Sequence, residues 1–248
     1  MACLALGLGL LLAPLPAQAQ GPSLKDFLFG HPSGTELAPG RYAPQEGEPF
    51  LIDHSGDGAV LVRFADSAEV WVLKPYSGPR GDVIYKNDVG DEILRATRLG
   101  GLTFFSHLHP TGEATAYYGE ASGLKLAPVP SPTVLFQAMV QASVRASRAV
   151  QHLVVFEAED LSPHDLEPTS GALIADAAAT TADAFSRLAA QGQTGKLLAA
   201  RYLRVRFVTG REPQARTSGA VLFVTVNPAL GYGGRPSSAR LMTVMARK

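Results

Sequence analysis

Two histidines and a glutamate in the middle of the chain have the types and spacing of a metal site. His107 and His109 are separated by one residue, and Glu113 follows four residues after His109. Residues two apart in a strand point to the same face, so both imidazoles can reach one ion, with Glu113 as a third ligand. Zinc suits this set and would activate a water molecule for hydrolysis. The alternative is an ordinary turn at an exposed strand end, because residues 110–112 read Pro-Thr-Gly.

A second group of side chains has the chemistry of a ligand site. Its polar members lie close together in the sequence: Arg80, Asp82, Tyr85, Asn87, Asp88 and Arg95. Hairpin pairing would bring the two arginines opposite the carboxylates. The result is either a structural ladder of ion pairs or a polar groove that binds a ligand, and the sequence leaves both interpretations open.

Three shorter patterns resemble known sites but lack an essential member. Residues 53–58 place oxygen-bearing side chains and a glycine as a calcium loop does, yet Phe64 stands where a bidentate glutamate is required. Residues 122–125 match the Ser-x-x-Lys spelling of penicillin-recognising enzymes without their companion sequences. Residues 192–196 lack the glycine spacing of a phosphate-binding loop. We therefore expect no cofactor.

The segment that carries the first two groups reads as a series of short antiparallel strands. β-prone runs recur at intervals of about ten residues, with glycine-containing turns between them. This spacing predicts hairpins in a meander or small barrel-like sheet. The alternation of residues 69–72 assigns Val70 and Val72 to one face of a strand and Glu69 and Trp71 to the other. The expected strands are residues 50–52, 59–64, 69–73, 82–85, 92–97, 102–106 and 115–118.

After three prolines the hydrophobic period shifts toward that of a helix. A helix is expected over residues 134–151, a buried strand over 152–157, and an alanine-rich helix through 191 that Thr169 or Ser170 caps. Further strands are expected over residues 202–208, 220–226 and 240–245. The strand-helix-strand order predicts a parallel pair of strands inside a two-layer module.

These elements predict an α+β fold. An N-terminal antiparallel β module, a meander or small barrel-like sheet, precedes a two-layer α/β module with two helices on a mixed four-stranded sheet. The predicted divisions are a signal peptide at 1–19, an extended arm at 20–49, the β module at 50–126, a proline-rich linker at 127–132 and the α/β module at 133–248.

The first residues have the composition of a secretory signal peptide. Residues 2–12 are almost entirely apolar, and residues 17–19 form a small-x-small cleavage site. This run is shorter than the roughly 20 residues that cross a bilayer core. We therefore expect a cleaved leader, no transmembrane segment in the mature chain and a periplasmic location. Cleavage also removes the single cysteine, Cys3, which excludes disulfides and thiolate chemistry from the mature chain.

Charge is balanced in total but not along the chain. Lys and Arg number 22, as do Asp and Glu, and this balance in an exported chain argues against nucleic acid as a partner. Residues 157–183 contain acids and no Lys or Arg, whereas residues 196–248 contain ten bases and one acid, Glu212. The two segments either pair with one another or leave a basic face for an anionic component of the cell envelope.

One stretch of the chain resembles a known family. Residues 80–90 read Arg-Gly-Asp-Val-Ile-Tyr-Lys-Asn-Asp-Val-Gly, followed by Leu-Arg-Ala-Thr at 94–97 and Gly-Gly-Leu-Thr at 100–103. This sequence is similar to that of a family of uncharacterised exported proteins, a domain of unknown function, from Caulobacter-like alphaproteobacteria. The resemblance covers most of the mature chain and implies a Gram-negative periplasmic setting. It implies no activity.

We therefore expect a non-catalytic protein of the periplasm or envelope with a binding or structural role. The sequence offers no recognisable set of nucleophile, base and orienting residue. Its partner would be an anionic envelope component or another protein. The alternative is a metal-dependent periplasmic hydrolase that uses His107 and His109.

Overall fold

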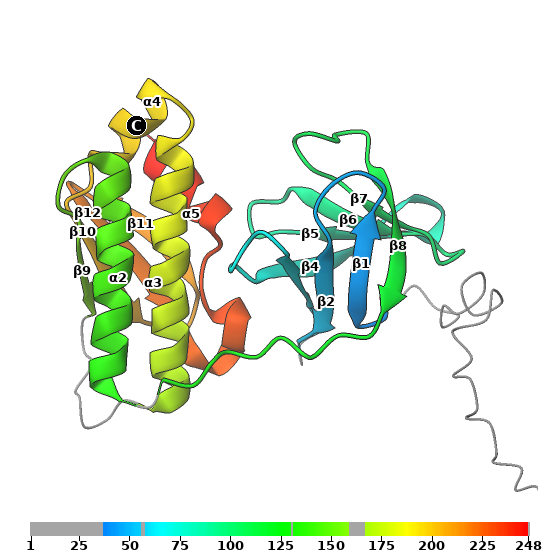
Figure 1. Ribbon diagram of the computed structural model, residues 1–248, viewed down its shortest axis with the longest axis horizontal. Helices are drawn as coiled ribbons and strands as arrows, with labels where there is room; N and C mark the ends of the chain where they lie inside the picture. The colour runs from blue at the N-terminus through cyan, green and yellow to red at the C-terminus, as the bar shows by residue number, and fades with distance from the viewer. Residues whose placement is uncertain (1–36, 56–57, 130, 159–166, 248) are drawn as a thin grey trace, which may run out of the picture. The chain divides into compact units, whose positions relative to one another are not determined.

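The computed structural model describes residues 37–55, 58–129, 131–158 and 167–247, which adopt an α+β fold (Figure 1). Eight antiparallel strands form a closed barrel, and four further strands form a separate sheet on which helices pack. The predicted class, with a barrel-like sheet followed by a mixed sheet with helices, is confirmed. The predicted signal peptide and most of the predicted arm lie outside the described residues.

The barrel strands follow one another in sequence order. Each strand pairs antiparallel with the next, and β1 closes the barrel by pairing with β8. Every strand predicted for this segment overlaps a strand of the structure. The strands are β1 (Gly40–Pro44), β2 (Phe50–His54), β3 (Val60–Phe64), β4 (Trp71–Ser77), β5 (Val83–Lys86), β6 (Glu92–Ala96), β7 (Leu102–Phe104) and β8 (Glu113–Gly119).

Strand β1 corrects the prediction of an extended arm over residues 20–49. Tyr42 in β1 pairs with Phe50, and the two rings stack with their centroids 5.9 Å apart. The Tyr117 ring meets Tyr42 edge-on at 5.4 Å. Burial raises the pKa of Tyr42 to about 12, because the ionised phenol would lose its hydration. Gly-Arg-Tyr-Ala-Pro shows no alternation of its own, so its neighbours β2 and β8 determine that it is a strand.

The barrel interior is filled by the inward side of each strand. Its buried members include Phe50, Ile52, Val62, Leu73 and Leu94. Trp71 also packs against this interior, whereas Val70 and Val72 belong to a second cluster around Leu61 and Leu124. The predicted alternation of faces is therefore confirmed for residues 70–72, although the outer face is covered here as well.

The C-terminal sheet has the strand order β11-β12-β10-β9. Strand β10 lies parallel to both β9 and β12, and β11 pairs antiparallel with β12. The predicted parallel pair on either side of a helix is therefore present. The strands are β9 (Val155–Ala158), β10 (Arg204–Thr209), β11 (Gln214–Ser218) and β12 (Val221–Val226). The helices are α2 (Pro132–Val150), α3 (Pro168–Ala189), α4 (Gln193–Ala199) and α5 (Ser238–Ala246), with a 3-10 segment, η2 (Pro228–Gly234), before α5.

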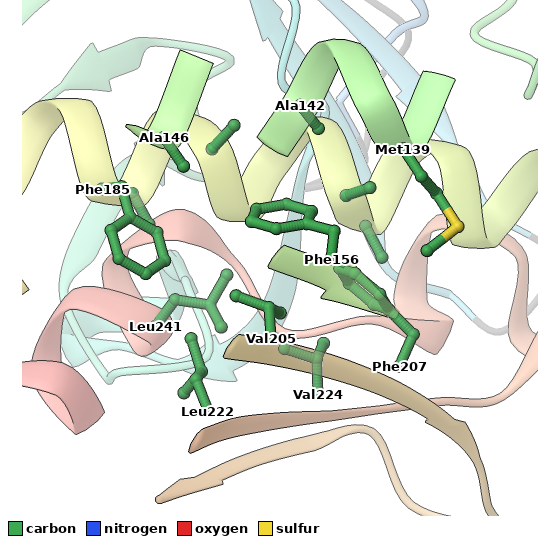
Figure 2. Close-up of a cluster of buried hydrophobic side chains, with 14 of the residues drawn as sticks. Met139, Ala142, Ala146, Phe156, Phe185, Val205, Phe207, Leu222, Val224 and Leu241 are labelled. Atoms are coloured by element: carbon green, nitrogen blue, oxygen red, sulfur yellow. The ribbon is translucent and has the colours of Figure 1, made fainter. Parts of the chain in front are cut away.

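Helices α2 and α3 run side by side over one face of this sheet (Figure 1). Small side chains at the contacts, such as Ala142 and Ala146, allow the helices to approach closely. The core residues shared between helices and sheet are labelled in Figure 2: Met139, Ala142, Ala146, Phe156, Phe185, Val205, Phe207, Leu222, Val224 and Leu241. The opposite face alternates with this one and, apart from the buried Thr225, carries half-buried or exposed side chains.

Two predictions for this module are wrong in detail, and one strand was not predicted. Residues 240–245 form helix α5 rather than a strand, because Ser237 accepts a hydrogen bond from the Arg240 amide as an N-cap and Leu241 and Met245 are buried one helical turn apart. Neither Thr169 nor Ser170 caps α3, which begins at Pro168 with Glu167 before it. Strand β11 was not predicted, since its polar residues lie at an exposed edge.

Among the helices that the structure describes, none combines the length and the apolar character that crossing a membrane requires.

Candidate functional site

Three of the six residues predicted for a ligand site meet on the outside of the barrel. Arg80 lies in η1 (Pro79–Gly81), the 3-10 turn between β4 and β5, and Asp82 follows it. Arg95 points outward from β6 because its neighbours Leu94 and Ala96 fill the interior. The Arg95 Nε donates a hydrogen bond to Asp82 Oδ2 at 3.0 Å. The hairpin pairing expected from the sequence is what brings the two residues together.

These three residues line a pocket of about 450 Å³. Its remaining lining residues are Pro79, Thr97 and Thr103. In the register of the barrel, Arg95 stands between Ile84 on β5 and Thr103 on β7. The pocket therefore combines two guanidinium groups, one carboxylate and two hydroxyl groups on a rigid sheet.

The other three predicted ligand residues lie elsewhere. Tyr85 is buried in the barrel core, where it pairs with Leu94. Asn87 stabilises the turn between β5 and β6, since its Oδ1 accepts hydrogen bonds from the amides of Val89 and Asp91. Asp88 accepts from Ser237 and so faces the C-terminal module. The structure does not gather the six residues into one groove.

The predicted metal ligands are only partly brought together. His109 Nε2 lies 4.0 Å from Glu113 Oε2, but His107 is exposed in the loop between β7 and β8. Glu113 Oε1 accepts a hydrogen bond from the Glu46 amide, which occupies that oxygen. Within the described ranges, no three His, Cys, Asp or Glu side chains form a group that could hold a metal ion. The three residues as placed do not fit the zinc site that the sequence suggested.

A basic surface lies on the face of the C-terminal sheet opposite the core. Arg204 Nη1 and Arg206 Nε both bind Glu157, at 3.2 and 3.0 Å from its two oxygens. Arg216 on β11 stacks its guanidinium 3.9 Å from the centre of the Phe223 ring. The registers place Glu157, Arg206, Phe223 and Arg216 in one row across four strands. We call Arg204, Arg206, Arg216 and Glu157 the basic sheet face.

A third cluster, which was not predicted from the sequence, is centred on Glu69, and only 3% of the surface of this glutamate is exposed. The Ser238 amide and hydroxyl donate to its two carboxylate oxygens at 2.8 and 2.6 Å. Arg235 Nη1 lies 3.8 Å and Arg187 Nη1 3.7 Å from the same carboxylate. Burial raises the pKa of Glu69, while the arginines and the two hydrogen bonds oppose that rise.

Arg235 ties this cluster to both modules. Its Nη2 donates to the Val70 carbonyl at 3.0 Å, and its Nε donates to Asp176 on α3. Asp88 accepts from the Ser237 amide at 2.9 Å, so two barrel carboxylates bind the first residues of α5, where the helix dipole favours negative charge. We call this set the Glu69–Arg235 cluster. Only the cap pattern at Ser237 could have indicated it, because Glu69 and Ser238 are 169 residues apart.

Comparison with known proteins places the chain in a family without assigning an activity. Neither the curated proteins nor the solved structures contain a significant match to the chain. A family model described as Domain of unknown function (DUF4908) matches residues 23–245. Because this match spans nearly the whole chain, the chain belongs to the DUF4908 family.

Proposed function

We propose that the protein is a non-catalytic binding protein of the cell envelope, exported to the periplasm, that attaches to an anionic envelope polymer through its basic sheet face. The observation that carries the proposal is the gathering of three arginines, Arg204, Arg206 and Arg216, on one face of the sheet. Arg204 and Arg206 bind Glu157, Arg216 stacks on the Phe223 ring, and the Arg204 side chain keeps 53% of its surface exposed. Arginine forks recognise carboxylate and phosphate groups well because they offer several donors in a fixed plane.

The flatness of a sheet suits an extended polymer rather than a small molecule. Arg204 and Arg206 are neighbours along β10, and Arg216 lies two strands away in the row of Arg206. The three charges therefore span the three neighbouring strands β10, β12 and β11, an arrangement that can follow an extended chain. The predicted signal peptide supports export, which would bring this face to the envelope.

Co-sedimentation with purified peptidoglycan sacculi tests the proposal. The triple variant Arg204→Gln, Arg206→Gln, Arg216→Gln should lose binding, and binding of the native protein should weaken as salt rises, because salt screens exposed charges. Glu157→Gln should bind more strongly than the native protein, since it removes a negative charge that binds Arg204 and Arg206. Arg148→Gln, an exposed arginine of α2, is the matched control.

Two results would refute this function. One is binding to sacculi that salt and the triple substitution leave unchanged. The other is absence of binding both to sacculi and to vesicles of anionic lipid.

Export is tested separately, by locating the full chain in periplasmic and cytosolic fractions of cells that express it. Intact protein with its leader in the cytosol would exclude the envelope as its place of action.

A further inference from the structure

We propose that the pocket beside η1 binds the carboxylate or phosphate group of a small anionic ligand through Arg80 and Arg95. This site lies on the barrel and shares no residue with the basic sheet face, so it does not depend on the function proposed above. Its volume, about 450 Å³, falls within the range of roughly 300–1,000 Å³ that small-molecule pockets occupy.

The charges that line the pocket are not balanced. Arg95 is paired with Asp82 at 3.0 Å, so these two groups largely neutralise each other. The Arg80 guanidinium forms no ion pair or hydrogen bond with any residue that the structure describes. The Arg80 charge thus has no partner among the described residues, and a bound oxyanion would neutralise it.

Asp82 holds Arg95 in a way that leaves its outer nitrogens available. The contact uses Arg95 Nε, whereas Nη1 and Nη2 donate to no side chain or carbonyl of the described residues. The Arg95 side chain is 32% exposed, so these nitrogens can be reached. A guanidinium fixed at one nitrogen is oriented in advance, which reduces the entropy lost when it binds an anion.

The backbone at Arg80 has a conformation that favours glycine. Arg80 has φ 58° and ψ 18°, in the left-handed region that costs most residues free energy. Hydrogen bonds from the Asp82 amide to the Pro79 carbonyl and from the Gly78 amide to the Asp82 carbonyl maintain this turn. The chain therefore keeps a long cationic side chain where a glycine would be less strained, as binding sites commonly do.

Neighbouring groups complete the site. Thr97 Oγ1 accepts a hydrogen bond from the Gly101 amide, which leaves its own proton free to be donated to a ligand. Gly81 packs against the stem of Arg98, since a Cβ at Gly81 would lie 2.6 Å from Arg98 Cδ. Arg98 thus lies beside the residue that follows Arg80, and its positive charge adds to the potential around η1.

Titrations followed by NMR test the proposal, with sodium phosphate and sodium glucuronate as separate probes and glucose as the uncharged control. Sodium chloride keeps the ionic strength constant. Shifts of the amides around η1 and β6 with phosphate alone would assign a phosphate ligand. Shifts with glucuronate alone would assign a carboxylate, and shifts with both would assign an oxyanion site that does not discriminate between them.

The variants Arg80→Gly and Arg95→Gln should each weaken binding about tenfold or more, because each removes a charged hydrogen-bond donor. Arg80→Gly should leave the fold intact, since its backbone conformation suits glycine. Arg41→Gln, an exposed arginine of the same barrel on β1, should bind as the native protein does. The proposal is overturned if neither anion binds, or if Arg80→Gly and Arg95→Gln bind as tightly as Arg41→Gln.

Discussion

The Glu69–Arg235 cluster and the Arg80–Arg95 pocket both combine arginine with carboxylate, but only the pocket is open to water. In the cluster, the Glu69 and Arg235 side chains are 2% and 1% exposed, and every oxygen of Glu69 has a donor. In the pocket, the Arg95 and Asp82 side chains are 32% and 17% exposed, and Arg80 has no partner among the described residues.

This difference in burial separates a structural role from a binding role. A buried charge must be compensated within the protein, because desolvation is costly and unpaired ions are strongly destabilising. An exposed charge can remain uncompensated, since water stabilises it until a ligand arrives. The same residue types therefore hold the fold together at Glu69 and leave a free charge at Arg80.

The largest effect that tests this contrast is expected from Glu69→Ala. The substitution leaves the Ser238 amide and hydroxyl without their acceptor and removes negative charge beside the buried Arg235. We expect the free energy of unfolding to fall by about 3–5 kcal/mol, as measured by urea denaturation. Glu48→Ala, at an exposed glutamate, should change it by less than about 0.5 kcal/mol. Equal effects would mean that Glu69 is not a structural charge.

The pH dependence of stability sharpens the same comparison. Because burial raises the pKa of Glu69 in the folded protein above its unfolded value, its contribution is complete below the unfolded pKa and is lost as pH rises through the folded pKa. The stability of the native protein relative to Glu69→Gln should therefore be greater at acidic pH than at neutral pH. Urea denaturation of both proteins at each pH gives this difference. A difference that grows toward neutral pH would contradict the raised pKa.

The pocket was partly predictable from the sequence, and the cluster was not. Arg80, Asp82 and Arg95 meet through adjacent hairpins, so a local pattern of strands and turns places them correctly. Tyr85 was predicted beside them but points inward, because it is opposite Leu94 in the register and the sequence did not settle that register. Glu69 was predicted only to lie on the strand face opposite Val70 and Val72. Its burial depends on Ser238 and Arg235, which no local pattern connects to it.

The strands and helices also differ in whether nearby or distant residues determine their secondary structure. Strands β2 to β8 follow from alternation and turn residues nearby in the chain. Strand β1 lacks such alternation and is specified by its pairing with β8, more than sixty residues away. Residues 240–245 fit both a strand and a helix by apolar content, and the cap at Ser237 decides for the helix.

A smaller effect is expected from Asp82→Asn in the pocket. The partly exposed pair with Arg95 should contribute less than about 1 kcal/mol to stability, since water reaches and screens it. The substitution removes the only carboxylate among the lining residues, so affinity for phosphate or glucuronate should rise. Stability and affinity would then change in opposite directions, which urea denaturation and the NMR titration measure separately. A loss of stability as large as that of Glu69→Ala would mean that the pocket is a structural ion pair.

The smallest effect is expected on the stability of the Arg80→Gly variant, which tests directly whether the Arg80 side chain has a structural role. Glycine relieves the left-handed strain at this position, and its greater freedom in the unfolded chain offsets part of the gain. We expect unfolding free energy to increase by about 0.5 kcal/mol, measured beside Arg80→Ala, which keeps the strain. If Arg80→Gly were instead clearly destabilising, the guanidinium would have a structural partner. Arg80 would then be a structural residue like Glu69 and Arg235, and the proposed difference between the buried cluster and the open pocket would be wrong.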